Sequence, residues 1–139
     1  MSNLQKKINL ICQELGWKPR VQANDSYLII ICPLAEDSHF KGVLFAISEN
    51  ENRLMMSASY RLTIAPEMNT AIYEEISRIN FGLLAGCLEF DSEHGEIRYR
   101  DGLFFPDLDA DTELLRAFIA TTLRDAITYH SEVETVISS

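Results

Sequence analysis

Apolar and polar residues along the chain fall into helical and strand-like periods that alternate with one another. The first apolar positions recur at helical spacing and are Leu4, Ile8, Ile11 and Leu15. This spacing predicts an amphipathic helix of about 14 residues at the start of the chain. Ser2 or Asn3 can cap its beginning, and Gly16 can stop it.

Strand-like patterns follow this helix. Residues 27–32 and 40–47 are apolar at both alternating phases, which predicts strands buried on both faces of a sheet, the first of them ended by Pro33. Residues 54–62 alternate between apolar and polar side chains, which indicates a half-buried strand. These segments predict an antiparallel meander, and residues 20–23 are a candidate for an additional short strand.

A second helix is predicted in the middle of the chain. Proline suits the first turn of a helix, so the helix is expected to open at Pro66 and to end at Gly82 or Gly86. Its apolar face carries Ile72, Ile76 and Ile79.

A hairpin over residues 88–100 follows this helix. Glu89 and Asp91 on its first strand lie on the same face as Arg98 and Arg100 on its second strand. We therefore expect ion pairs across the two strands.

A long apolar stripe ends the chain and predicts a final helix of about 28 residues, which Asp109 caps. The stripe consists of Leu115, Phe118, Ile119, Thr122, Ala126, His130, Val133 and Ile137. The element order is therefore α-β-β-β-α-β-β-α, an α+β fold in which an antiparallel sheet has three flanking helices. We expect residues 1–139 to form a single domain.

The acidic composition narrows the range of partners. The 139 residues include 21 Asp and Glu against 12 Lys and Arg, a formal net charge of −9. Carboxylates repel phosphate backbones and anionic lipid surfaces, so we expect neither nucleic-acid binding nor membrane binding. The N-terminus lacks the apolar segment of a signal peptide, and Cys12, Cys32 and Cys87 are an odd and widely spaced set. Both features favour a cytoplasmic protein with reduced thiols.

Motifs of catalytic, metal or cofactor chemistry are missing from the sequence. None of the histidines, His39, His94 and His130, forms the close ligand pair with another histidine or a cysteine that zinc sites show. The sequence also has neither a nucleophile elbow nor a glycine-rich phosphate loop. We therefore expect no catalytic residues, no metal and no cofactor.

The predicted fold leaves more apolar surface than a small sheet with helices on one side can cover. The candidate protein-interface residues are Trp17, Met55, Leu103, Phe104 and Phe105. Phe104 is in phase with Arg98 and Arg100, so it should point away from the core. Either loops or the long helix cover these residues, or they form a dimer or partner interface.

Residues 79–91, INFGLLAGCLEFD, and residues 95–100, GEIRYR, resemble the YbjN family. Members of this family carry an asparagine late in the middle helix, here Asn80, followed by a strand, an acidic turn and a returning strand. The resemblance covers nearly all of the chain and implies the fold of the type III secretion chaperones, a twisted antiparallel sheet flanked by helices and usually dimeric. Those chaperones hold partly unfolded clients against apolar grooves. The resemblance supplies no catalytic residues, and we expect Asn80 to bond backbone groups near the helix end.

Two classes of function fit these observations. The first is a non-enzymatic protein-binding module, chaperone-like or an adaptor, that acts as a homodimer on a protein client. The alternative is a regulatory or small-ligand-sensing domain in signalling or stress response. In that alternative, Arg61, Arg98 and Arg100 could hold an anion in a site assembled across a dimer.

Overall fold

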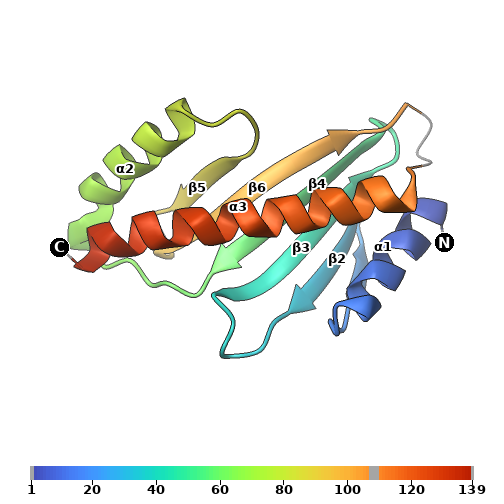
Figure 1. Ribbon diagram of the computed structural model, residues 1–139, viewed down its shortest axis with the longest axis horizontal. Coiled ribbons are helices and arrows are strands. Elements are labelled where there is room, and N and C mark those ends of the chain that lie inside the picture. Colours follow the sequence, from blue (N-terminus) through green and yellow to red (C-terminus); the bar gives the residue numbers. More distant parts are fainter. Residues whose placement is uncertain (1, 107–109, 139) are drawn as a thin grey trace.

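The computed structural model describes residues 2–106 and 110–138, which form one twisted sheet with helices alongside it (Figure 1). The helices are α1 (Asn3–Glu14), the 3-10 helix η1 (Pro66–Met68), α2 (Asn69–Phe81) and α3 (Thr112–Ser138). The strands are β1 (Arg20–Ala23), β2 (Leu28–Pro33), β3 (Phe40–Ser48), β4 (Arg53–Tyr60), β5 (Cys87–Asp91) and β6 (Glu96–Phe104). They pair antiparallel in the order β1-β2-β3-β4-β6-β5. The predicted α+β fold is confirmed, and the candidate strand at residues 20–23 is present.

Local signals in the sequence explain where α1 begins and ends. The Oγ of Ser2 accepts a hydrogen bond from the N–H of Gln5 at 3.2 Å, which caps the helix. Gly16 follows the helix with a φ of 77°, a left-handed conformation that glycine adopts without steric cost. One side of α1 is buried in the core through Leu4, Ile8, Ile11 and Cys12.

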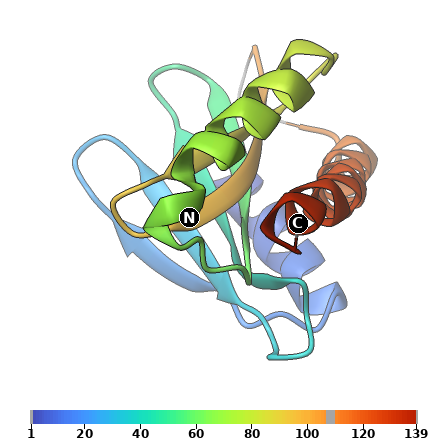
Figure 2. The ribbon, with the colours of Figure 1, turned by 90° about the vertical axis from the view of Figure 1, so that its left-hand side faces the viewer.

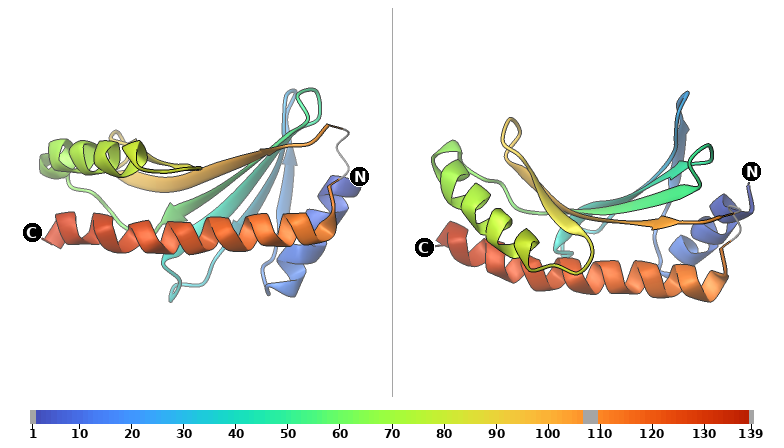
Figure 3. Two further views of the ribbon diagram at one scale, coloured as in Figure 1. Left: turned by 45° about the horizontal axis from the view of Figure 1, so that its top comes forward. Right: turned by 90° about the horizontal axis from the view of Figure 1, so that it is seen from above.

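Helix α3 runs across one face of the sheet, with α1 beside its N-terminal end (Figures 1 and 3). Its buried stripe consists of Leu115, Phe118, Ile119, Thr122, Ala126, His130 and Val133, as the sequence predicts, whereas the eighth predicted residue, Ile137, is half-buried. The hydroxyl of Tyr60 donates a hydrogen bond to the carbonyl oxygen of Ala126 at 2.6 Å and fixes the helix to β4. Asp109, the expected cap, lies outside the described residues. None of the described helices, α3 included, has the length and apolar character of a membrane span.

Helix α2 lies at the opposite end of the sheet from α1, beside β5 (Figure 2). Its buried face consists of Ile72, Ile76 and Ile79, as predicted. The helix is preceded by a 3-10 turn that begins at Pro66, and Gly82 is its C-terminal cap.

Strands β2 and β3 are not buried on both faces, contrary to the expectation from their sequences. Helices α1 and α3 lie on the same side of the sheet, and the other side is concave with no described helix over it (Figure 3). Ile30 and Phe45 face the helices and are fully buried, whereas Ile31 and Leu44 face the concave side and are half-buried. Pro33 is the last residue of β2, so the strand ends where the sequence predicts.

The hairpin of β5 and β6 differs from the prediction in one ion pair. Glu89 contacts both arginines, Arg98 at 2.6 Å and Arg100 at 3.3 Å. Asp91 instead pairs with His94 at 2.7 Å, because the turn brings the imidazole Nδ1 next to its carboxylate. This contact lowers the pKa of Asp91 and raises the pKa of His94.

Candidate functional site

The concave side of the sheet, which we call the open face, is the candidate functional site. Strand pairing arranges its side chains in rows that cross the sheet. One row contains Gln22, Ile29, Ala46, Met55 and Gly102; the next contains Arg20, Ile31, Leu44, Ser57, Arg100 and Cys87. A third contains Pro33, Gly42, Ser59, Arg98 and Glu89. The open face is therefore apolar over β2 and β3 and charged over β5 and β6.

The apolar part of the open face surrounds a hollow of about 370 Å³. Its apolar lining consists of Tyr27, Ile29, Leu44, Ala46 and Met55. These side chains are half-buried, apart from Tyr27, which is 45% exposed. A group of large apolar side chains in this state loses further solvent contact when a second surface lies against it.

Small residues form the floor between the apolar part and the charged part. Ser57 is 2% exposed although it faces the concave side, because its neighbours in the same row, Leu44 and Arg100, are larger. Gly102 has no room for a larger residue without adjustment, since a Cβ there would lie 3.3 Å from the carbonyl oxygen of Leu54. The floor is therefore low, which deepens the concave surface along the sheet.

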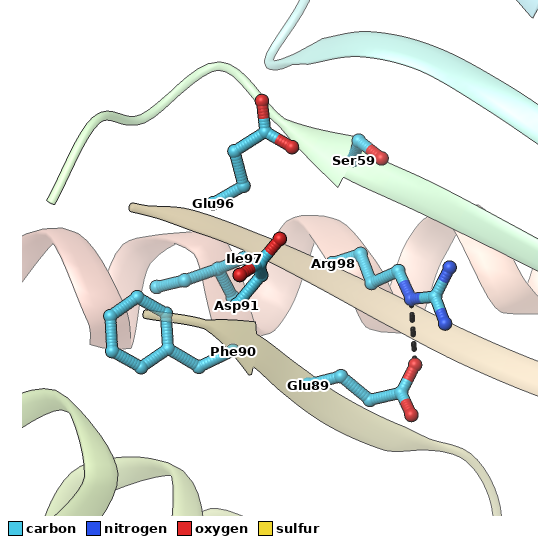
Figure 4. Close-up of a pocket in the computed structure, with 7 residues that line it drawn as sticks. All are labelled: Ser59, Glu89, Phe90, Asp91, Glu96, Ile97 and Arg98. Atoms are coloured by element: carbon cyan, nitrogen blue, oxygen red, sulfur yellow. Dashed lines mark hydrogen bonds and ion pairs between the residues drawn. The ribbon is translucent and has the colours of Figure 1, made fainter. Parts of the chain in front are cut away.

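The charged part of the open face surrounds a second hollow, of about 410 Å³ (Figure 4). The guanidinium of Arg98 points toward the carboxylate of Glu89, while the carboxylate of Glu96 lies on the other side near Ser59 (Figure 4). Glu89 also accepts the contact from Arg100, so one carboxylate serves two guanidinium groups. Asp91 and Glu96 line the same hollow, so its lining carries three carboxylates and one guanidinium and is acidic overall.

The two edges of the sheet differ in how they are protected. At the β5 edge, the amide of Asn80 accepts a hydrogen bond from the N–H of Leu88 at 2.8 Å and donates one to its carbonyl oxygen at 3.0 Å. The side chain of Asn80 thus occupies the positions that a neighbouring strand would use, and the expectation that it bonds backbone groups is confirmed. At the other edge, all four residues of β1 (Arg20–Ala23) are exposed.

Two large apolar side chains lie almost wholly in solvent beside the protected edge. Phe81, at the end of α2, is 95% exposed, and Leu84, in the loop that leads to β5, is 106% exposed relative to its reference state. Tyr73 of α2 packs edge-on against Phe90 of β5 with ring centroids 5.0 Å apart, and it is itself 49% exposed. The α2–β5 side of the molecule therefore carries a second apolar surface.

The structure separates the five interface residues that the sequence suggests. Met55 and Phe104 lie on the open face, and Phe104 is 61% exposed beside the guanidinium of Arg53. Leu103 points to the helix side, where it packs half-buried against the core, and Trp17 does the same beyond α1. Phe105 is 3% exposed and belongs to the core.

The most prominent open-face residues, Ile29, Ile31 and Leu44, were missed by sequence reasoning, which placed them in the core. The signal that could have found them is the apolar character of β2 and β3 at both phases, since the chain predicts helices for one face only. Phe81 and Leu84 gave no such signal, because an apolar residue at a helix end is as often buried as exposed.

The residues that could bind an anion or a metal either hold the backbone in place or lie in an exposed turn. Arg61 donates hydrogen bonds to four backbone carbonyl groups of residues 34–40, so its guanidinium does not join Arg98 and Arg100. Among the described residues, one group could offer a metal three ligand atoms within 4.8 Å of one another: Asp91, Glu93 and His94. All three are exposed, and Asp91 already accepts the hydrogen bonds of the turn.

Solved structures share this fold. A chain from the crystal structure of the ExsC–ExsE complex superposes with a TM-score of 0.66 at 15% identity, covering 94% of this chain and 96% of that one. An uncharacterized protein from Methanothermobacter thermautotrophicus gives a TM-score of 0.65 at 10% identity, covering 96% and 99%. YbjN from E. coli, described as "a putative transcription regulator", gives 0.60 at 13% identity, covering 91% and 87%. These likenesses confirm the fold that the resemblance to the YbjN family implies.

Comparison with protein families agrees with the structural likeness. A sequence search found no match among curated proteins. The model of the YbjN family, described as "Putative bacterial sensory transduction regulator", matches residues 5–135. This match spans every helix and strand from α1 to most of α3 and includes Asn80 with its hydrogen-bonded edge strand. The chain therefore belongs to the YbjN family.

Proposed function

We propose that this chain is a non-enzymatic protein-binding module, chaperone-like or an adaptor, that holds an extended segment of a client protein against its open face. The observation that carries the proposal is the row of half-buried apolar side chains over β2 and β3 that no described part of the chain covers. An apolar surface of this kind on a soluble acidic chain favours a protein partner. The ExsC–ExsE complex, which has a related fold, supports the same class of function.

The free edge at β1 favours an extended partner over a folded one. At the end of the β1–β2 hairpin, the N–H of Asn24 donates to the carbonyl oxygen of Tyr27. From this pair onward, hydrogen-bonded and non-hydrogen-bonded residue pairs alternate along the two strands. By this alternation, the backbone groups of Val21 and Ala23 point outward, away from β2. A client segment can therefore add as a seventh strand beside β1, and the part of the client that follows can cross the open face.

The client that fits is apolar with acidic residues on one side. Its apolar side chains would cover Ile29, Leu44 and Met55, and a carboxylate would reach Arg53 and Arg100, which line the same hollow. The chain itself has an excess of acidic residues, so such a client would bind because of local charge complementarity despite the net charge of −9.

The proposed homodimer uses the α2–β5 side. Phe81 and Leu84 are almost fully exposed there, and a second copy would cover both. Asn80 blocks strand pairing at this edge, so the two copies would meet through side chains. In sedimentation analysis we expect the wild type to be a dimer and the variant Phe81→Glu with Leu84→Glu a monomer. Leu114→Glu, at a 51% exposed position of α3, should leave the dimer intact.

A sensing role is the second candidate. The family description points to sensory transduction, and Arg98 and Arg100 on the open face could hold a small acidic ligand in place of an acidic residue of a protein. Arg61 is used by backbone carbonyls, so Arg98 and Arg100 would be the basic groups of that site. A protein of either kind would act in the cytoplasm.

The proposal is tested by capture from native extract with matched variants. Met55→Lys places a charge on the apolar part of the open face, and Leu10→Lys places the same charge at a 49% exposed position of α1. We expect the wild type and Leu10→Lys to retain one stoichiometric client that Met55→Lys loses, with circular dichroism unchanged in all three. Equal retention by Met55→Lys would contradict a role for the open face. Two results together would favour the sensing role. Arg98→Ala alone would lose binding of the client, and a metabolite would raise the thermal stability of the wild type but not that of Arg98→Ala.

A further inference from the structure

Two cysteines from different elements meet inside the core. Cys12 on α1 and Cys32 on β2 are both 0% exposed, and the thiol of Cys32 donates to the sulfur of Cys12 with the two Sγ atoms 3.7 Å apart. This contact joins the first helix directly to the sheet. The third cysteine, Cys87, is half-buried in β5 and faces the open side of the sheet, so the sheet separates it from the pair.

We propose that Cys12 and Cys32 form a site of reversible thiol–disulfide exchange, with a low-molecular-weight disulfide such as glutathione disulfide as the oxidant. Neither the proposed client binding nor the family description assigns a role to these thiols.

The exchange proceeds in two balanced steps. The thiolate of one cysteine attacks a sulfur of glutathione disulfide, so that a mixed disulfide forms and one glutathione leaves as a thiol. The thiolate of the second cysteine then attacks the protein sulfur of the mixed disulfide and expels the second glutathione. The two protein thiols lose two electrons and two protons, and glutathione disulfide gains them. A reduced thiol pool reverses both steps.

The geometry favours the second step over persistence of the mixed disulfide. The second sulfur already lies in contact at 3.7 Å, so it competes with free glutathione at a high effective concentration. A disulfide bond is about 2.05 Å long, so closure requires the sulfurs to approach by roughly 1.6 Å. Rotation of the two side chains together with a small shift of the terminal helix can supply that movement.

The electrostatics of the pair agree with this order of events. The hydrogen bond with Cys12 lowers the pKa of Cys32 against the opposing effect of burial. The hydrogen bond with Cys32 and burial both raise the pKa of Cys12. One thiol of the pair can therefore ionise while the other donates a hydrogen bond to it.

Access to the buried thiols requires local opening of α1. Polar contacts join α1 to α3 and to the segment before it: Lys7 Nζ donates to the carbonyl oxygen of Ala110 at 2.6 Å, and Glu14 pairs with Arg116 at 2.8 Å. Opening of one element costs less free energy than unfolding of the whole fold. Once formed, the bond closes a segment that contains β1 and prevents that opening.

The test uses the full chain with Cys87→Ser, which leaves only the pair. The variant is equilibrated in glutathione buffers, once in the native state and once in urea. Each sample is quenched in acid, alkylated under denaturing conditions and measured by mass spectrometry. Trypsin cleavage after Arg20 separates Cys12 from Cys32, so the two peptides remain joined only through the disulfide. For a loop of this length, the effective concentration of the two thiols should be about a hundred-fold higher in the native state than in urea. The same stabilisation should raise the urea midpoint of the oxidised protein by about 1–2 M.

The result expected is an intramolecular disulfide whose effective concentration in the native protein is more than ten-fold above that in urea, together with native circular dichroism. A value of ten-fold or less, a glutathione adduct as the main product, or two free thiols in every buffer would each overturn the proposal. Because the readout is taken on a protein with both cysteines in place, it does not depend on a substitution in the core. Client capture is not part of the readout, so failure of the proposed function leaves this result unaffected.

Discussion

Replacement of Asn80 by alanine should destabilise the protein by removing the contact that ends the sheet at β5. The wild-type amide makes two hydrogen bonds to Leu88, one to its N–H at 2.8 Å and one to its carbonyl oxygen at 3.0 Å. Each bond of this kind contributes about 0.5–1.5 kcal/mol, so the loss of both gives about 1–3 kcal/mol. Alanine leaves the edge groups of a part-buried strand without a partner.

The measurement is the free energy of unfolding from urea titration, followed by circular dichroism. With a denaturant slope of about 1–3 kcal/mol/M, the midpoint should fall by roughly 1 M. The matched control is Ser77→Ala, an exposed position on the same helix, which should change the free energy of unfolding by less than about 0.5 kcal/mol. Asn80→Asp keeps the acceptor for the Leu88 N–H but opposes a carboxylate to the Leu88 carbonyl, so it should not rescue stability.

A free energy of unfolding for Asn80→Ala within about 0.5 kcal/mol of that for Ser77→Ala would refute this reasoning. A second consequence follows from the same geometry. The unmasked β5 edge offers unpaired backbone groups, so Asn80→Ala should self-associate at concentrations where the wild type does not change its state.

Three further predictions concern stability. Gly86→Ala should lower the free energy of unfolding by more than about 2 kcal/mol in urea titration, because φ is 72° and the new Cβ would lie 2.6 Å from Cζ of Tyr99. Gly16→Ala, where φ is 77° and no atom lies within 4 Å of the new Cβ, should lower it by about 1 kcal/mol. Tyr60→Phe removes the hydrogen bond to α3 and should cost about 1 kcal/mol in the same assay, and no change would contradict a stabilising role for this bond. Burial, and to a smaller extent the neighbouring His39, lowers the pKa of His130. The imidazole therefore binds a proton more readily in the unfolded chain than in the folded protein. Stability should fall as the pH drops through the unfolded pKa of about 6.5. Urea midpoints at pH 7.5 and 5.5 should therefore differ more in the wild type than in His130→Leu, and equal differences would contradict the assignment.

Periodicity in the sequence predicts those parts of the fold in which one face meets the core and the other meets water. The stripe of α3 and the face of α2 are of this kind, and each buries the residues that its period indicates. Strands β2 and β3 are different because they are apolar at both phases. A pattern of this kind does not distinguish a strand that is covered on both faces from a strand whose second apolar face is left uncovered by its own chain.

The candidate site was predicted in part for the same physical reason. Phase alone places Phe104 on the side of Arg98, and the structure agrees. Phe105, the next residue, falls in the opposite phase and enters the core, so adjacency in sequence to an exposed aromatic residue is a poor guide to exposure. The contact between Cys12 and Cys32 depends on how α1 meets the sheet, and sequence spacing carries no information on it.

Site-specific photocrosslinking tests the central claim, that the open face binds a client. A photoreactive residue replaces Leu44, at the centre of the apolar rows, and separately replaces Leu10 on α1 and Leu114 on α3, both of which are exposed on the helix side. In native extract we expect one discrete crosslinked client at position 44 and none at positions 10 and 114. A client that crosslinks at position 10 or 114 and not at position 44 would show that the helices form the binding surface, and would contradict the account.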